Sequence, residues 1–250
     1  MPQTSQTAHA SPPDQKDRGA AQSAFESLLA AIVAGTYPPG EKLPPERDLA
    51  RELGASRPTL REALRRLGAW QLIEARRGSG LVVRPRREWS VEVLPAYLRH
   101  GGAPGEPKPI RVLADALVLR RSMVYEIISL VSERIPAGGT AAARSAARQA
   151  WARRHDGAAY AAADFEVTRG LVEAADFLPA LWLLNRLSSV FEELSRSFSD
   201  FIAPPEDYLE THDRLFAAIE AGDPGAALAI ARAHFEAHDR RLLASAESPG

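Results

Sequence analysis

Positively charged side chains concentrate in one short part of the sequence, between Ser56 and Arg87. This stretch holds nine arginines and two acidic residues, whereas the chain of 250 residues has 31 Lys and Arg, 32 Asp and Glu, and a formal net charge of -1. Arg57, Arg61 and Arg65 follow one another at intervals of four residues, which places them on one face of a helix. A local cationic cluster on a nearly neutral chain indicates a polyanionic partner.

A second set of residues suited to chemistry lies in the C-terminal half. Asp164 and Thr168 are four residues apart, and His212 and His234 follow in two later segments. Imidazole and carboxylate groups are ligands of zinc, nickel and similar divalent ions. The alternative is that the two histidines make ordinary hydrogen bonds between helices, and the residues alone leave both interpretations open. The sequence has no cysteine, which excludes disulfides and thiolate metal sites.

The elements that position the arginines can be predicted from apolar spacing and from helix-ending residues. Helices are expected within 21–35, 43–54 and 56–70. Ser56 is a natural N-cap of the third helix and Pro58 suits its first turn. Only Gly54 and Ala55 separate the second and third helices, which is typical of a helix-turn-helix. Strand-like residues at 72–75 and 81–83 flank a turn rich in Arg and Gly, so the pattern predicts a winged helix.

The rest of the chain is predicted to be helical, which makes the fold class mainly α. A polar tail over 1–20 precedes the winged helix of 21–84, and a linker with a short helix is expected over 85–109. The domain of 110–246 is predicted to be an antiparallel α-helical bundle of about six helices, at 110–135, 140–155, 158–175, 177–202, 205–221 and 224–246. No run of 18 apolar residues predicts a membrane span, and the N-terminus lacks a secretory signal, so a cytoplasmic location is expected.

The segment LPPERDLARELGASRPTLREALRRLGAWQLIEARRGSGLVV resembles the DNA-binding domain of the GntR family of bacterial transcription regulators. The resemblance implies a winged-helix homodimer on a pseudo-palindromic operator of double-stranded DNA. It departs from the family at Gln71, where glycine is usual. Arg57 and Arg77 are expected to read base edges, and the other contacts to hold mostly phosphates. The full set of expected DNA contacts is Arg47, Ser56, Arg57, Thr59, Arg61, Arg77 and Gly78.

The C-terminal part is similar to the helical effector-binding domain of the FadR branch, the FCD domain. The resemblance implies a divalent metal, Zn or Ni, held by Asp164, His212 and His234, although Thr168 stands where the family has a fourth ligand, a histidine. It also implies effector contacts by Arg120, Thr168 and Asn185. The surviving ligand set favours an organic acid as effector. The missing histidine, and a local likeness to fatty-acyl-responsive members, leave acyl-CoA as the second class.

These observations predict a ligand-responsive transcriptional regulator, expected to be a repressor, and not an enzyme. One alternative is a metal-dependent hydrolase that uses Asp164, His212 and His234 to activate water. It lacks an HExxH motif, a phosphate-binding loop and a nucleophile elbow. The other alternative is a DNA-binding protein without an effector. The sequence does not identify the effector, the operator or the controlled genes.

Overall fold

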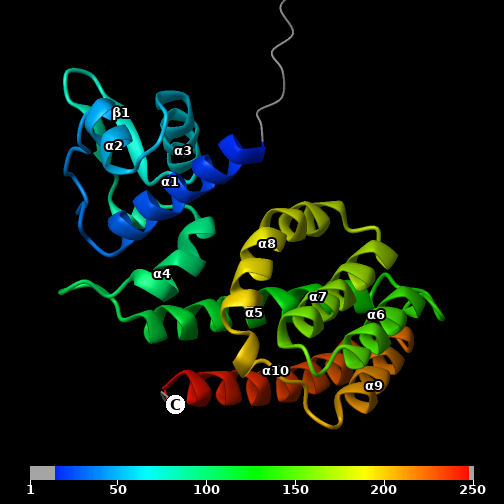
Figure 1. Ribbon diagram of the computed structural model, residues 1–250. Helices are drawn as coiled ribbons and strands as arrows, with labels where there is room; N and C mark the ends of the chain where they lie inside the picture. The colour runs from blue at the N-terminus through cyan, green and yellow to red at the C-terminus, as the bar shows by residue number, and fades with distance from the viewer. Residues whose placement is uncertain (1–14, 248–250) are drawn as a thin grey trace, which may run out of the picture. The chain divides into compact units, whose positions relative to one another are not determined.

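The computed structural model describes residues 15–247 and divides the chain into two compact units, Met1–Ala96 and Tyr97–Gly250 (Figure 1). The boundary between the units falls inside the stretch 85–109 that was predicted to be a linker. Residues 1–14 of the predicted tail lie outside the described residues. The prediction of a tail over 1–20 is wrong for 15–20, because helix α1 begins at Gln15. The apolar repeat of this helix starts only at Ala21, and the sequence pattern therefore placed its beginning too late.

The N-terminal unit is a winged helix-turn-helix, which confirms the predicted fold. Its helices are α1 (Gln15–Val33), α2 (Glu46–Glu52) and α3 (Arg57–Ala69), and both α1 and α2 pack against α3. Strands β1 (Ile73–Arg76) and β2 (Gly80–Val83) pair antiparallel, and Lys42 bridges to Val82 beside them. Two 3-10 turns follow, η1 (Arg86–Glu88) and η2 (Val91–Val93).

An apolar core between α1 and α3 fixes the orientation of α3. Phe25 of α1 is 2% exposed and meets Trp70 edge-on, with 4.8 Å between ring centroids. The predicted stripe on α3 is buried, and it consists of Leu60, Ala63, Leu64 and Leu67. Burial of this stripe leaves the opposite face of α3 exposed. The turn after α3 places Gln71 at φ 59°, in the left-handed region that favours glycine. The glutamine adopts this backbone conformation with some strain, because its Cβ crowds the backbone there.

The C-terminal unit is a bundle of helices, as predicted. After α4 (Leu94–His100), which crosses the unit boundary, the bundle helices are α5 (Pro109–Ser132), α6 (Ala141–Ala152), α7 (Gly157–Ala174), α8 (Leu178–Ser197), α9 (Tyr208–Glu220) and α10 (Pro224–Glu247), with the turn η3 (Ser199–Phe201) between α8 and α9. Helix α7 packs on α6 and α8, and α10 packs on α5 and α9. Within residues 15–247, no helix is long and apolar enough to cross a membrane.

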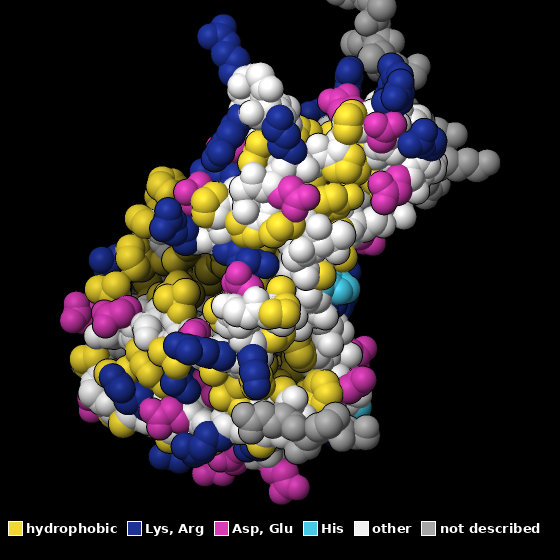
Figure 2. Space-filling view, turned by 90° about the vertical axis from the view of Figure 1, so that its left-hand side faces the viewer, with side chains coloured by type: hydrophobic (Ala, Val, Ile, Leu, Met, Phe, Trp, Pro, Cys, Tyr) yellow, Lys and Arg dark blue, Asp and Glu magenta, His cyan; other side chains and the backbone are white. Residues whose placement is uncertain are grey.

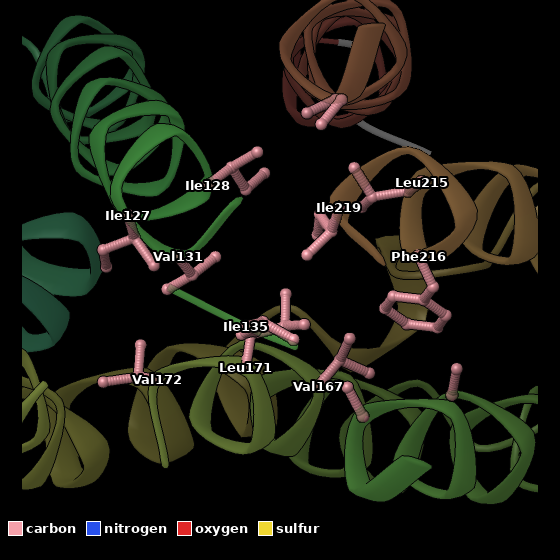
Figure 3. Close-up of a cluster of buried hydrophobic side chains, with 14 of the residues drawn as sticks. Ile127, Ile128, Val131, Ile135, Val167, Leu171, Val172, Leu215, Phe216 and Ile219 are labelled. Atoms are coloured by element: carbon pink, nitrogen blue, oxygen red, sulfur yellow. The ribbon is translucent and has the colours of Figure 1, made fainter. Parts of the chain in front are cut away.

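The core of this bundle lies where α5, α7 and α9 face one another (Figure 3). Ile128 and Val131 of α5 point toward Leu171 of α7 and Ile219 of α9. These four side chains are between 0% and 3% exposed. Burial of branched apolar side chains from three helices fixes the frame in which the polar residues of α7, α9 and α10 come together.

Candidate DNA-binding surface and ligand pocket

The N-terminus of α3 is closed by a side-chain cap. The Ser56 hydroxyl oxygen accepts a hydrogen bond from the Thr59 backbone N–H at 3.3 Å, and the two hydroxyl oxygens lie 2.6 Å apart. Pro58 has no backbone N–H and the Leu60 N–H donates to the Ser56 carbonyl oxygen, so the Arg57 N–H is the donor of the first turn that is left for an anion such as a phosphate. The structure does not favour the predicted phosphate contact of Thr59, because this residue is only 6% exposed and its hydroxyl is hydrogen-bonded to the Ser56 hydroxyl.

The arginines on the exposed side of this unit differ in their ion pairing. Arg61 donates to Glu46 at 2.9 Å, Arg65 pairs with Glu62 at 2.5 Å, and the Arg47 Nε lies 3.6 Å from Asp48. Exposed ion pairs of this kind contribute only about 0–1 kcal/mol, so a phosphate can replace the carboxylate at little cost.

Three arginines of this unit stand apart from this pairing. In the part of the chain that the structure describes, the guanidinium groups of Arg57, Arg77 and Arg87 make no hydrogen bond or ion pair, and all three residues are exposed. Figure 2 shows several Lys and Arg side chains projecting from the surface of the N-terminal unit. The guanidinium groups of Arg57 and Arg77 are free to meet a polyanion, and that these two arginines read base edges stays a prediction.

The wing tip brings Arg77 and Gly78 to the end of the hairpin. Strand pairing ends at Arg76 and Gly80, and the Ser79 N–H donates to the Arg76 carbonyl at 2.9 Å. Gly78 has a φ of 75°, and no atom lies within 4 Å of the Cβ that another residue would place there. Glycine is thus required at this position by backbone conformation rather than by crowding.

The C-terminal unit encloses a small pocket between α5, α7, α9 and α10. Asp164, Thr168, His212 and His234 all line it, and the remaining lining is mostly apolar, including Ile128. The structure therefore brings together the three predicted metal ligands and the threonine that replaces the fourth. The pocket has a volume of about 30 Å³.

Hydrogen bonds already engage several polar atoms of this pocket. The Tyr208 hydroxyl donates to Asp164 Oδ1 at 2.6 Å, and His212 Nδ1 donates to the Tyr208 carbonyl oxygen at 2.8 Å. Burial, followed by the charge of Asp164, raises the pKa of Tyr208 and Tyr160 above the ordinary value, so both phenols stay protonated. Burial, followed by the charge of His212, lowers the pKa of His234 to about 4.

The side chains do not form the metal site that the resemblance implies. Among residues 15–247, no group of three His, Asp or Glu side chains is arranged to hold a metal ion. The donor set gives a physical reason. Thr168 replaces one imidazole with a neutral hydroxyl, and one oxygen of Asp164 accepts the Tyr208 hydroxyl. The arrangement of the described side chains does not confirm Zn or Ni bound by Asp164, His212 and His234, and this metal site stays a prediction.

The other two predicted effector residues lie outside the pocket lining. Arg120 donates to Asp239 at 2.5 Å, and Arg121 donates to the second oxygen of the same carboxylate at 2.9 Å. Asn185 is exposed on α8 and accepts a hydrogen bond from Arg169 at 2.8 Å. Of the three predicted effector contacts, the structure places only Thr168 in the pocket wall.

Sequence reasoning missed Tyr208, which precedes His212 by four residues on α9. Residues four apart share a helix face, so the same spacing that linked Asp164 to Thr168 would have indicated it. His238 follows His234 by four residues on α10. Burial, followed by the charge of Arg120, lowers the pKa of His238 to about 4.

Family models match both units of the chain. The model described as bacterial regulatory proteins, gntR family, matches residues 20–83, and the FCD domain model matches residues 115–237. The first range covers the helix-turn-helix and the wing. The second covers most of the helical bundle, including every residue of the small pocket.

Curated relatives agree with this division. An uncharacterized HTH-type transcriptional regulator of Mycobacterium tuberculosis is 33% identical over 88% of this chain and 88% of its own length. The galactonate operon transcriptional repressor of Escherichia coli is 29% identical over 84% of this chain and 91% of its own. A probable D-xylose utilization operon transcriptional repressor of Paenarthrobacter nicotinovorans is 30% identical over 89% of this chain and 87% of its own length.

A solved structure shares the fold. Lar, which controls expression of the agr system of Listeria monocytogenes, superposes with a TM-score of 0.58 at 16% identity, covering 93% of this chain and 98% of that one. The winged helix with its exposed arginines, the helical bundle and the matches over both units agree: the chain belongs to the GntR family of bacterial transcription regulators and carries an FCD effector-binding domain.

Proposed function

We propose that this regulator represses its target genes by binding a pseudo-palindromic operator as a homodimer, with α3 in the major groove and the wing beside it. The observation that carries the proposal is the pair of exposed, unpaired guanidinium groups of Arg57 and Arg77, one at the N-terminus of α3 and one at the hairpin tip. An arginine fork fits the O6 and N7 acceptors of guanine. A protein that acts on chromosomal DNA works in the cytoplasm.

The DNA contacts are tested with an operator selected from random duplexes and with fluorescence anisotropy. Arg57→Ala should weaken binding to the selected site by about 1–3 kcal/mol and relax base choice at one position. Arg61→Ala should weaken all sequences about equally and lower the slope of log affinity against log salt by about 1. Arg148→Ala removes an exposed arginine from the other unit and serves as the control. Wild-type affinity of the Arg57 variant for both selected and random DNA would disprove the assignment of α3.

The proposed dimer rests on operator geometry and on exposed apolar side chains of the C-terminal unit. Two recognition helices must reach major grooves about 34 Å apart. Leu178 and Trp182 lie four residues apart on one face of α8 and are 50% and 66% exposed. Neighbouring exposed apolar side chains of this size favour a protein–protein contact. Trp182→Glu should shift the protein toward monomer in sedimentation velocity, while the matched change Leu228→Glu on a half-buried site of α10 tests whether simple destabilisation gives the same result.

The effector that the C-terminal unit fits best is a small carboxylate. The cavities there have volumes of about 30 and 220 Å³, and these are small beside the ~300–1,000 Å³ of ordinary ligand sites. They do not accommodate an acyl chain with its coenzyme A. The named operons of two relatives, for galactonate and for D-xylose utilization, also favour sugar-derived ligands. Release of operator DNA by one member of a carboxylate panel supports this function, and an operator affinity that no member changes would favour the effector-independent DNA-binding protein.

A further inference from the structure

A second cavity adjoins the small pocket on the surface of the C-terminal unit. We name it the α9–α10 groove, and it is lined by Pro205, Asp207, Thr211, Arg214, Ile230, Ala233, His234, Ala237 and Arg241. The two cavities share Thr211, Ile230 and His234 as lining residues. The inner pocket of about 30 Å³ has room for about two water molecules, whereas the groove of about 220 Å³ has room for a small metabolite.

The charged side chains of the groove suit a singly charged acid. Arg214 of α9 and Arg241 of α10 are exposed, and within residues 15–247 neither makes a hydrogen bond or an ion pair. Asp207 is the acidic residue of the lining, and it accepts a hydrogen bond from the Thr211 hydroxyl at 3.3 Å. The two arginines and Asp207 together give the lining one net positive charge, which one carboxylate neutralises.

A phosphate monoester fits this charge less well. It carries about 1.5 to 2 negative charges at neutral pH, so the groove would leave part of that charge unmatched. The arginine fork binds either anion through two parallel hydrogen bonds, so the net charge of the groove is what favours the carboxylate. Hydroxyl groups next to the carboxylate would find partners in Thr211, Asp207 and His234, which supply a hydroxyl oxygen that accepts, a carboxylate and an imidazole.

We propose that the α9–α10 groove binds the carboxylate of a small hydroxylated acid between Arg214 and Arg241. The identification of this acid as the effector rests on the proposed function, but the binding itself does not. His234 belongs to the wall of both cavities. A ligand in the groove therefore contacts a side chain that also bounds the buried polar cluster of Asp164 and His212, and through it the ligand reaches the interior of the bundle.

The proposal is tested by calorimetric titration of the full-length protein with D-glycerate, D-xylonate and D-galactonate. Their uncharged counterparts glycerol, xylitol and galactitol are titrated alongside. At least one acid should bind and no polyol should bind. Arg214→Ala and Arg241→Ala should each raise the Kd of that acid at least about tenfold, because each removes charged hydrogen bonds to the carboxylate. Arg240→Ala, an exposed arginine of α10 outside the lining, should leave the Kd unchanged.

A substitution that should lower the Kd of the acid separates an effect of charge from an effect of damage to the fold. Asp207→Asn removes the negative charge of the groove and should lower the Kd of the acid by about threefold or more. A general loosening of the bundle would instead raise it. Tighter binding of glycerol 3-phosphate than of D-glycerate would overturn the choice of a carboxylate. Absence of binding by all three acids, or equal Kd values for wild type and the two arginine variants, would overturn the site.

The two proposals fail in distinguishable ways. If an acid releases operator DNA equally well from wild type, Arg214→Ala and Arg241→Ala, the groove is not its site and the regulator function stands. If the acid binds in the groove as expected but leaves operator affinity unchanged, the groove stands and the ligand-responsive function fails.

Discussion

Acidification is expected to destabilise the C-terminal unit, because two histidines of α10 are held as neutral imidazoles. Burial is the largest cause that lowers the pKa of His234 and of His238 from 6.5 to about 4. Nearby positive charge, from Arg120 among others, adds to this effect. Since the folded pKa lies below the unfolded value, the unfolded chain binds more protons than the folded chain between these two values. The contribution of these two histidines to the free energy of unfolding is therefore constant above about pH 6.5 and falls as the pH drops from 6.5 toward 4.

The magnitude follows from the size of the pKa difference. The full difference between 6.5 and about 4 corresponds to about 3 kcal/mol for each histidine. At pH 5 the folded imidazoles are still mostly neutral, so each contributes a loss of about 2 kcal/mol relative to pH 7.5. A loss of this size is a large fraction of the ~5–15 kcal/mol by which an ordinary domain is stable.

Two measurements on the full chain check this expectation, both made with a chelator present. NMR titration of the histidine Cε1–H signals gives the two pKa values directly, with His234→Gln and His238→Gln used for assignment. Urea unfolding at pH 7.5 and pH 5 gives the stability change, which should shrink in the variant that lacks both histidines. Measured pKa values of 6 or more for both residues would refute the claim that burial controls their protonation.

Three further substitutions have defined outcomes. Gln71→Gly should stabilise the N-terminal unit by up to ~1 kcal/mol in urea unfolding, because it relieves a φ of 59°, and Gln71→Ala should bring no such gain. Gly157→Ala should destabilise the C-terminal unit by about 1–3 kcal/mol, because the added Cβ would overlap backbone atoms of η3. Gly19→Ala on α1 is the control: its Cβ would enter open space, so this variant should not destabilise the N-terminal unit. Tyr208→Phe should cost about 1–3 kcal/mol by leaving the buried Asp164 oxygen without its donor, and an unchanged stability would contradict the reading of that contact as a structural hydrogen bond.

Local patterns made the elements of both units predictable. The leucine stripe of α3 and the N-cap at Ser56 act within a few residues of one another, so spacing alone locates them. The helix predicted over 224–246 is found at Pro224–Glu247 for the same reason, since Asp223 and Pro224 mark its beginning in the sequence itself.

The interior of the bundle was less predictable, because it depends on how distant helices face one another. Leu184 is buried while its neighbour Asn185 is exposed, and a run of apolar residues before them gives no phase by which to tell the two apart. The hydrogen bond between Tyr208 and Asp164 joins residues 44 positions apart, and no local pattern specifies it. Sequence spacing thus identified Asp164, His212 and His234 as residues of one site, and the structure places all three in one pocket. Spacing did not reveal that the Tyr208 hydroxyl donates a hydrogen bond to one carboxylate oxygen of Asp164.

The placement of His234 has a consequence for how a ligand acts on the protein. A ligand shifts an equilibrium only by the difference between its affinities for the two states, so an acid in the α9–α10 groove must sense a group that differs between them. His234 borders both the groove and the buried cluster around Asp164, so we expect a bound acid to act on the interior of the bundle through this side chain. By reciprocity, operator DNA must change the affinity of the acid by the same factor by which the acid changes that of the operator, and couplings of this kind are about 5–150-fold. Titrating the acid with and without operator duplex therefore measures the coupling independently of any DNA-release assay, and an acid Kd that the operator leaves unchanged would show that the groove is not coupled to DNA binding.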